Sequence, residues 1–139
     1  MFDCIIYATD GSEHAREALA YARDLAKLHQ TRLYIVHAYA PLVDLKNFGN
    51  YDEIIALRIA QGHEILDAAL EELVPHGIDV HTELLEGPMA EAIIRIAEVR
   101  DADLIIIGAR GLSSFQGLLL GSVSQKVIQY APCPVLVVR

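Results

Sequence analysis

The sequence predicts an α/β fold in which helices cover both faces of one mostly parallel β-sheet. Short apolar runs alternate with longer segments of helical periodicity, in the order β-α-β-α-β-α-β-α-β. Parallel strands need such crossover segments between them, and these segments are usually helices. The chain of 139 residues, with 53% hydrophobic and 22% charged residues, has the size and composition of one globular domain. We therefore expect residues 1–139 to form a single domain.

The predicted strands are apolar and rich in β-branched residues. They cover residues 2–8, 32–38, 78–85, 104–107 and 134–138. The fourth, Leu-Ile-Ile-Ile, is apolar throughout, as expected of a parallel strand buried on both faces. The third alternates apolar and polar residues in its first half, which favours a position at the edge of the sheet.

The predicted helices cover residues 13–29, 52–75, 88–100 and 124–130. Ser12 can cap the first of them, while Asp10 could serve as the cap instead or contact a ligand. Gly62 lies inside the second helix and costs up to ~1 kcal/mol relative to alanine, so we expect a packing reason or a slight kink there. Residues 41–50 contain proline, glycine and two asparagines and are predicted to form an irregular connection.

Composition excludes several classes of function. The net charge of −8 disfavours binding to nucleic acid or to anionic membranes. The apolar runs are shorter than the ~20 residues of a membrane span, and the N-terminus lacks the features of a secretory signal. Cys4 and Cys133 form neither a disulfide framework nor a metal-binding spacing. Together these features predict a cytoplasmic protein without a structural disulfide.

A glycine-rich segment follows the fourth strand and ends at a predicted helix. Gly108 and Gly111 begin it, and Gly121-Ser122 ends it. The first amides of a helix lack partners within the helix and carry partial positive charge, so such a segment can bind an anion. The alternative is that these glycines only form a turn and cap the helix. If the segment does bind phosphates, we expect amides around Gly111, Gly121, Ser122 and Val123 to hold them.

The spacing of this segment is Gly, two residues, Gly, nine residues, Gly-Ser. It resembles the nucleotide-binding signature of the universal stress protein family. Thr9-Asp10-Gly11-Ser12 and the ending at residues 131–138 resemble the first loop and last strand of that family, so the resemblance covers the whole chain. It implies a three-layer α/β/α, Rossmann-like domain similar to the adenine nucleotide alpha hydrolases. Its five-stranded sheet would have the order 3-2-1-4-5.

The resemblance also implies an adenine-nucleotide site, with ATP or another adenylate as ligand. Mg²⁺ could accompany the nucleotide, and Asp10 would then contact it through water. Asp10 is expected near the ribose or adenine, and the backbone of Ala38 at the adenine edge. Ala8 and Ala38 stand where larger aliphatic residues or proline are common in the family. The complete set of expected nucleotide-binding residues is Ala8, Thr9, Asp10, Ala38, Gly108, Arg110, Gly111, Ser113, Gly121, Ser122 and Val123.

Signatures of catalysis are missing from the sequence. No Gly-Lys-Ser/Thr ends the glycine segment, so it is not a Walker A loop, and no serine lies in a Gly-x-Ser-x-Gly elbow. The histidines lack a His-x-x-x-His pair, and His37 is more readily explained as a structural residue than as a ligand. The sequence therefore favours a stress-response or signalling module that holds ATP with little or no turnover. A nucleotide-independent interaction protein and a slow, self-phosphorylating ATPase are the alternatives.

The fifth strand predicts a homodimer. Residues 134–138 are short, apolar and β-branched, and the sequence ends one residue later, at Arg139. If the strand lies at the end of the sheet, as the resemblance implies, its outer edge has no partner within the chain. An unpaired edge of this kind favours pairing with another chain, and a two-fold axis would place it antiparallel to its copy.

Overall fold

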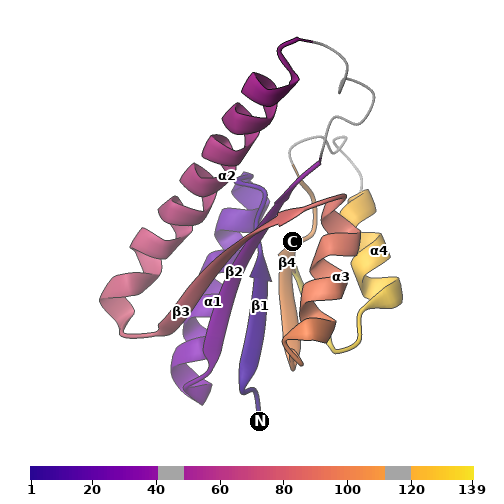
Figure 1. Cartoon of the computed structure of the whole chain (residues 1–139). Helices are drawn as coiled ribbons and strands as arrows, with labels where there is room; N and C mark the ends of the chain where they lie inside the picture. Colours follow the sequence, from indigo (N-terminus) through magenta and orange to yellow (C-terminus); the bar gives the residue numbers. More distant parts are fainter. Residues whose placement is uncertain (41–48, 112–119) are drawn as a thin grey trace.

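The computed structural model describes residues 1–40, 49–111 and 120–139. The described strands form one five-stranded sheet in the order β3-β2-β1-β4-β5, and every neighbouring pair is parallel. Figure 1 shows the sheet with helices on both sides. The expected fold class and strand order are therefore confirmed. Most of the predicted irregular connection, at residues 41–48, and the middle of the glycine segment, at residues 112–119, lie outside the described residues.

The elements follow the predicted alternation. The strands are β1 (Cys4–Ala8), β2 (Arg32–Tyr39), β3 (Asp79–Glu86), β4 (Leu104–Gly108) and β5 (Val135–Val138). The helices are α1 (Glu13–His29), α2 (Tyr51–Leu73), α3 (Met89–Val99) and α4 (Ser122–Tyr130), with a short 3₁₀ helix, η2 (Val74–His76), after α2.

The centre of the sheet is β1, which pairs with β2 on one side and β4 on the other. Ala8, its last residue, lies opposite Val36 of β2 and Ile107 of β4. The chain runs outward from β1 in one direction to β2 and β3, and in the other to β4 and β5. The order therefore reverses beside β1, which is where parallel α/β sheets leave a crevice for ligands.

Alternation along the strands divides the core into two layers. Ile5 and Tyr7 of β1 face α1 and α2, whereas Ile6 and Ala8 face α3 and α4. All four side chains are at most 1% exposed, so β1 is buried on both faces. This burial explains why its sequence is almost continuously apolar.

The start of α4 differs from the prediction. The helix begins at Ser122, two residues earlier than expected, because Gly121 has an extended backbone and its carbonyl accepts the first helical bond from Gln125 N at 3.0 Å. Ser124, the predicted first residue, lies inside the helix and is 2% exposed. Its Oγ donates to the carbonyl of Gly108 at 2.7 Å and so ties α4 to the end of β4.

The glycine inside α2 has a packing reason. A Cβ on Gly62 would lie 2.6 Å from Cδ1 of Leu84, so with alanine there the side chain of Leu84 would have to shift. Leu66 of α2 is buried, whereas Ile55 and Ile59, which follow the same helical spacing in the first half of the helix, are only half-buried. Figure 1 shows the reason, since this half of the helix projects beyond the sheet.

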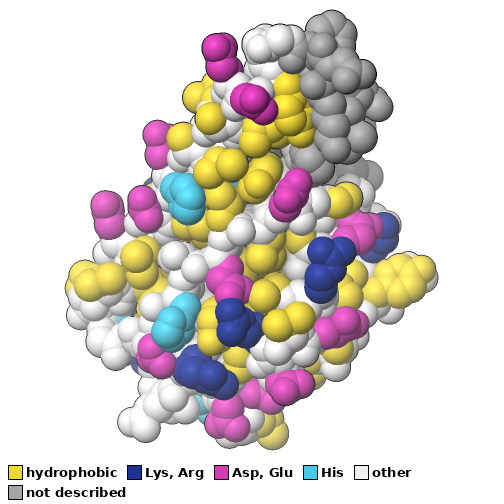
Figure 2. Space-filling model, viewed as in Figure 1, with side chains coloured by type: hydrophobic (Ala, Val, Ile, Leu, Met, Phe, Trp, Pro, Cys, Tyr) yellow, Lys and Arg dark blue, Asp and Glu magenta, His cyan; other side chains and the backbone are white. Residues whose placement is uncertain are grey.

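The open face of the sheet near β3 carries mixed charges. Arg100 lies over the ring of Tyr34, 4.8 Å from its centroid, and forms an ion pair with Glu83. His81 stacks on the same ring, with 5.1 Å between the ring centroids. Figure 2 shows acidic and basic side chains interspersed over the visible face. None of the described helices combines the length and the apolar character that crossing a membrane requires.

Candidate functional site

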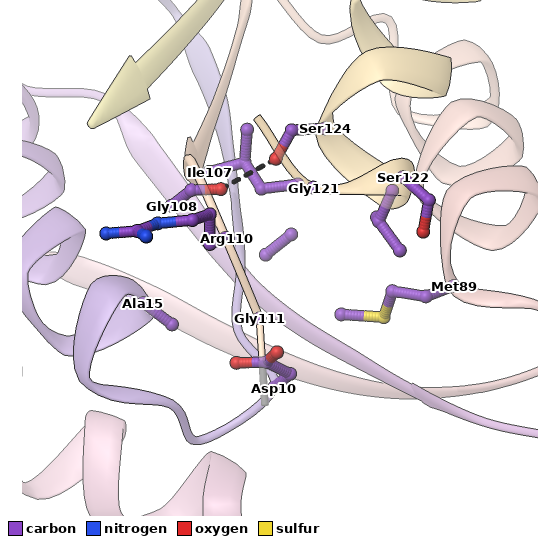
Figure 3. Close-up of a pocket in the computed structure, with 12 residues that line it drawn as sticks. Asp10, Ala15, Met89, Ile107, Gly108, Arg110, Gly111, Gly121, Ser122 and Ser124 are labelled. Atoms are coloured by element: carbon purple, nitrogen blue, oxygen red, sulfur yellow. Dashed lines mark hydrogen bonds between the residues drawn. The ribbon is translucent and has the colours of Figure 1, made fainter. Parts of the chain in front are cut away.

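A cavity of about 270 Å³ lies at the carboxyl ends of β1 and β4, and we call it the β1–β4 cavity. Figure 3 shows Met89 and Ser122 on one side of it and Ala15 and Arg110 on the other. It occupies the crevice expected where the strand order reverses. The residues that line it are Ala8, Asp10, Ala15, Met89, Ile107, Gly108, Arg110, Gly111, Gly121, Ser122, Val123 and Ser124.

The turn after β1 fixes Asp10 at the cavity. Its Oδ1 accepts from Ser12 N at 2.9 Å, and Ser12 Oγ in turn accepts from Ala15 N at 3.2 Å. Ser12 is therefore the N-cap of α1, as expected from the sequence. A Cβ on Gly111 would collide with Asp10 Oδ2. Glycine at position 111 thus leaves room for the carboxylate where β1 and β4 end.

Gly108 lets α1 approach the end of β4. A Cβ on Gly108 would lie 2.8 Å from the carbonyl carbon of His14 and 2.9 Å from Ala15 N. These neighbours are backbone atoms in the first turn of α1, so a side chain could be accommodated only by moving the helix. Beneath this turn, the hydroxyl of Tyr7 donates to the carbonyl of Ala15. The side of the cavity next to α1 is therefore built on close backbone packing.

The N-terminus of α4 forms the opposite wall. Gly121 N donates to the carbonyl of Ala109 at 2.7 Å, so this amide is already engaged. The first bond within α4 comes from Gln125 N, which leaves the amides of residues 122–124 without partners in the helix. Three such amides at the positive end of a helix favour an anion. The first backbone amide of this segment that could bind an anion is therefore that of Ser122, one residue after Gly121.

Most of the expected nucleotide-binding residues line this cavity. They are Ala8, Asp10, Gly108, Arg110, Gly111, Gly121, Ser122 and Val123. Ser113 lies outside the described residues. Strands β1 and β4, the turn after β1 and the start of α4 thus bring together residues more than a hundred positions apart in the chain.

Thr9 and Ala38 are placed elsewhere. Thr9 is 3% exposed, and its Oγ1 accepts from Gly11 N at 3.1 Å. It lines a separate hollow between α1 and α2, on the other side of the sheet. Ala38 lies near the end of β2, opposite Leu85 of β3, and is not among the described residues that line the cavity.

Four lining residues were not expected from the sequence: Ala15, Met89, Ile107 and Ser124. Ile107 is the last apolar residue of the strand that leads into Gly108, so its position beside the glycines was a usable signal. Met89 has no such signal. It is the first residue of α3, and only the packing of α3 beside α4 brings it to the cavity.

Among the described residues, the charged side chains that line the cavity are those of Asp10 and Arg110. A carboxylate and a guanidinium in one cavity suit a ligand that has hydroxyl groups and an anionic part. Within residues 1–40, 49–111 and 120–139, no three His, Cys, Asp or Glu side chains are grouped closely enough to hold a metal ion. The arrangement is therefore equipped for binding through amides, hydroxyls and one guanidinium.

With this geometry in place, comparison with known proteins identifies the family. Residues 1–139 match the universal stress protein family. The chain belongs to this family. A universal stress protein of Thermus aquaticus is 41% identical over 140 residues, covering 100% of both chains. A universal stress protein of Methanocaldococcus jannaschii is 36% identical over 141 residues, covering 100% of this chain and 83% of its own length.

Solved structures of universal stress proteins share the fold. The structure of hypothetical protein MJ0577 superposes with a TM-score of 0.90 at 30% identity, covering 99% of this chain and 96% of that one. A universal stress protein in complex with cAMP has a TM-score of 0.74 at 27% identity, covering 99% and 97%. The universal stress protein from Archaeoglobus fulgidus in complex with dAMP has a TM-score of 0.73 at 25% identity, covering 100% and 98%.

Proposed function

We propose that this chain binds an adenine nucleotide, ATP foremost, in the β1–β4 cavity. It would act as a stress-response or signalling module with little or no turnover. The observation that carries the proposal is the convergence of three features on one cavity. These are the carboxylate of Asp10, the glycines that end β4, and the unpaired amides that begin α4.

The start of α4 is the part of the cavity best suited to phosphates. The amides of residues 122–124 have no helical partner, and Ser122 adds a hydroxyl beside them. Arg110 lines the same cavity and supplies a positive charge. Charge-assisted bonds from guanidinium and amides to phosphate oxygens are the strong contacts of such sites. If the phosphates bind at this wall, the ribose would lie near the turn after β1, where Asp10 can contact it.

The remaining lining is apolar and suits a flat base. Ala8, Ile107 and Met89 line the cavity together with Val123. A methionine thioether makes favourable contacts with aromatic rings and adapts to their shape. Solved relatives at 27% and 25% identity hold cAMP and dAMP, which supports an adenine base as the ligand here. Competition with ATP and GTP tests the choice of base, and equal affinity for both would contradict it.

Binding without rapid turnover is supported by the residues of the cavity. Fast phosphoryl transfer needs a positioned nucleophile and neutralisation of charge on the transferred group. Asp10 is the one carboxylate among the described lining residues, and its Oδ1 is held by Ser12 N. Mg²⁺ bound with ATP would meet Asp10 through water. Steady ATP hydrolysis that is lost in Asp10→Ala would instead favour the slow ATPase.

The decisive experiment is extraction of the purified protein with acid, followed by chromatography of the released nucleotide and calorimetric titration with ATP. We expect Gly121→Val to abolish measurable binding, because the side chain would stand where phosphate approaches α4. Gly49→Ala is the control, since a Cβ there meets nothing within 4 Å. Parent-like ATP affinity in Gly121→Val would contradict the phosphate assignment.

The proposal includes a homodimer through β5. This strand lies at the end of the sheet beside β4, so its outer edge is available for pairing with a second copy. Val138 is 7% exposed whereas Val137 is half-buried, so Val137→Lys is the better test. Light scattering should give a dimer for the parent and for the exposed-site control Leu57→Lys, and a monomer for Val137→Lys. A parent that is monomeric at micromolar concentration, with or without ATP, would rule the dimer out.

A further inference from the structure

A second hollow lies on the opposite side of β1 from the β1–β4 cavity, between α1 and α2, and we call it the α1–α2 hollow. Its volume is about 550 Å³, within the range of sites for small molecules. It shares the turn after β1 with the β1–β4 cavity. Asp10 lines the cavity, whereas its neighbours Thr9 and Gly11 line the hollow.

The floor of the hollow is apolar. Leu19 of α1 is 4% exposed, and Ala69 of α2 is 8% exposed. Ile65 and Ala68 continue this surface along α2, and Tyr7 lies beneath it. The hydroxyl of Tyr7 is tied to the carbonyl of Ala15 and so is directed toward α1. The floor therefore offers contact area for an apolar or aromatic group.

The rim of the hollow is acidic. Glu64 and Glu72 stand on α2 two turns apart, on the same face as Ile65 and Ala68, and both line the hollow. A shallower extension toward α1 is lined by Glu13 and Glu17 as well as by Glu72. Of the residues that the structure describes, Arg16 is the one basic residue that lines either part. Four carboxylates thus face one guanidinium.

These carboxylates are not paired across the hollow. The ion pairs found among the described residues join other side chains, such as Arg23 with Asp24 and Lys126 with Glu91. The charge of Glu72 affects Tyr7, which lies beneath the floor of the hollow. Burial is the main reason that the pKa of Tyr7 rises to about 12; the negative charges of Glu72 and Asp10 add to the rise, and Arg16 opposes it. Carboxylates therefore outnumber cations among the described residues that line the hollow.

We infer that the α1–α2 hollow is a binding site for a small organic cation with an apolar or aromatic body. Its ammonium group would lie between Glu64 and Glu72, and its apolar body would cover Leu19 and Ile65. A bare metal ion does not fit, since no three carboxylates of the described chain are close enough to share one. An anion would meet four carboxylates, and a polar cation would leave the apolar floor uncovered. Only a ligand that has both parts matches both surfaces.

Tryptamine is a suitable probe, and indole-3-propionate is its matched control because it carries the same ring and the opposite charge. Calorimetric titration of the full chain should detect tryptamine and not indole-3-propionate. Added NaCl should weaken the binding through screening of the charges. In two-dimensional NMR spectra of ¹⁵N-labelled protein, the amides of Gly11 and Ala68 should shift on addition of tryptamine. Saturating ATP should not displace the amine.

Two variants locate the site. Glu64→Gln with Glu72→Gln should weaken tryptamine binding by roughly five- to tenfold, as expected for losing two exposed charge contacts. Glu53→Gln with Glu71→Gln removes the same charge from exposed positions of α2 outside the hollow and should leave the affinity unchanged. Ala68→Phe should abolish binding, because the ring would occupy the hollow from its exposed rim.

Three results would overturn the inference. The first is no heat or shift with tryptamine in the parent at millimolar concentration. The second is equal binding of indole-3-propionate. The third is displacement of tryptamine by ATP, which would place the amine in the β1–β4 cavity. The first two results do not depend on whether the chain binds ATP, and the third requires that it does, so failure here is distinguishable from failure of the proposed function.

Discussion

On one side of β1, two walls of the β1–β4 cavity are built on closely packed backbone, whereas on the other side the α1–α2 hollow lies between side chains. Gly108 packs against the backbone of His14, and the opposite wall is the amide end of α4. The hollow instead lies between the side chains of two helices, at Leu19 and Ile65. Backbone walls tolerate little change in volume, whereas exposed side chains can be exchanged. The two sites should therefore respond very differently to added atoms.

Substitutions that add atoms to the β1–β4 cavity and to the α1–α2 hollow should differ most in their effect on the free energy of unfolding. Gly108→Ala adds one carbon that would lie 2.8 Å from the carbonyl carbon of His14, and overpacking of this kind costs about 2–3 kcal/mol of unfolding free energy. Ala68→Phe adds a whole ring at an exposed position and should change stability by less than ~0.5 kcal/mol. Urea denaturation of both variants measures the difference. Equal losses would show that the two sides do not differ in this way.

The phenol of Tyr7, beneath the α1–α2 hollow, should give a pH-dependent effect. Burial raises the pKa of Tyr7 from 10.0 to about 12 in the folded chain. The neutral form is therefore favoured by folding, and its stabilisation is complete below pH 10 and is lost as the pH rises toward 12. The parent should lose up to roughly 2–3 kcal/mol more than Tyr7→Phe across this window. At pH 7 the variant should be less stable by ~1 kcal/mol, since it lacks the bond to Ala15.

In the same pair of proteins, urea denaturation at pH 7, 10 and 12 separates these effects. If the parent and Tyr7→Phe lose the same free energy between pH 10 and 12, ionisation of Tyr7 does not contribute to alkaline unfolding.

Two serines of α4 distinguish support of the cavity from contact with its ligand. Ser124→Ala removes a buried bond to the carbonyl of Gly108 and should cost about 1–2 kcal/mol of unfolding free energy. Ser122→Ala changes an exposed residue at the start of the same helix, so stability should change by less than ~0.5 kcal/mol while ATP affinity falls. Denaturation and calorimetry on both variants provide the test. A stable Ser124→Ala would mean that its hydroxyl does not hold α4 to β4.

The smallest effect is expected at the glycine inside α2. Alanine at position 62 would gain up to ~1 kcal/mol of helix propensity. It would also push Cδ1 of Leu84, the end of a flexible side chain, from 2.6 Å away. The two effects oppose each other, so Gly62→Ala should lie within ~1 kcal/mol of the parent. If Gly62→Ala loses as much free energy of unfolding as Gly108→Ala, then Leu84 cannot move aside, and the packing of α2 on β3 is as rigid as the backbone contact at Gly108.

Local chemistry made much of the fold predictable. Ser12 caps α1 as expected, and the alternation in the third strand correctly indicated an edge position. The start of α4 was predicted two residues late, at Ser124, whose hydroxyl bonds to the carbonyl of Gly108. That partner lies sixteen residues away, beyond the reach of any helix-capping pattern. Ile55 and Ile59 followed helical spacing yet stay half-buried, since spacing does not reveal where the sheet ends.

Some residues of the candidate site could likewise be predicted from the sequence, and others could not. Glycines at 108, 111 and 121 were visible in the sequence because backbone approach needs the same residue type wherever it occurs. Met89 was not expected at the cavity and Thr9 was expected there, since the hollow that each residue lines depends on how α3 and α1 pack on the sheet. The α1–α2 hollow had no signature at all, as its acidic rim follows ordinary helical spacing.

The sequence by itself determined the alternation of strands and helices, the buried central strands and the glycine positions that leave room for backbone contacts. These are set by local periodicity, side-chain volume and backbone freedom. Tertiary structure decided which residues meet across the sheet. Parallel pairing of β1 with β4 places Asp10 beside Gly111, and the same turn directs Thr9 to the opposite face. Which face each residue lies on depends on the pleat of the strand, and which residues meet depends on the strand order. Strand order brings together residues about a hundred positions apart in the chain.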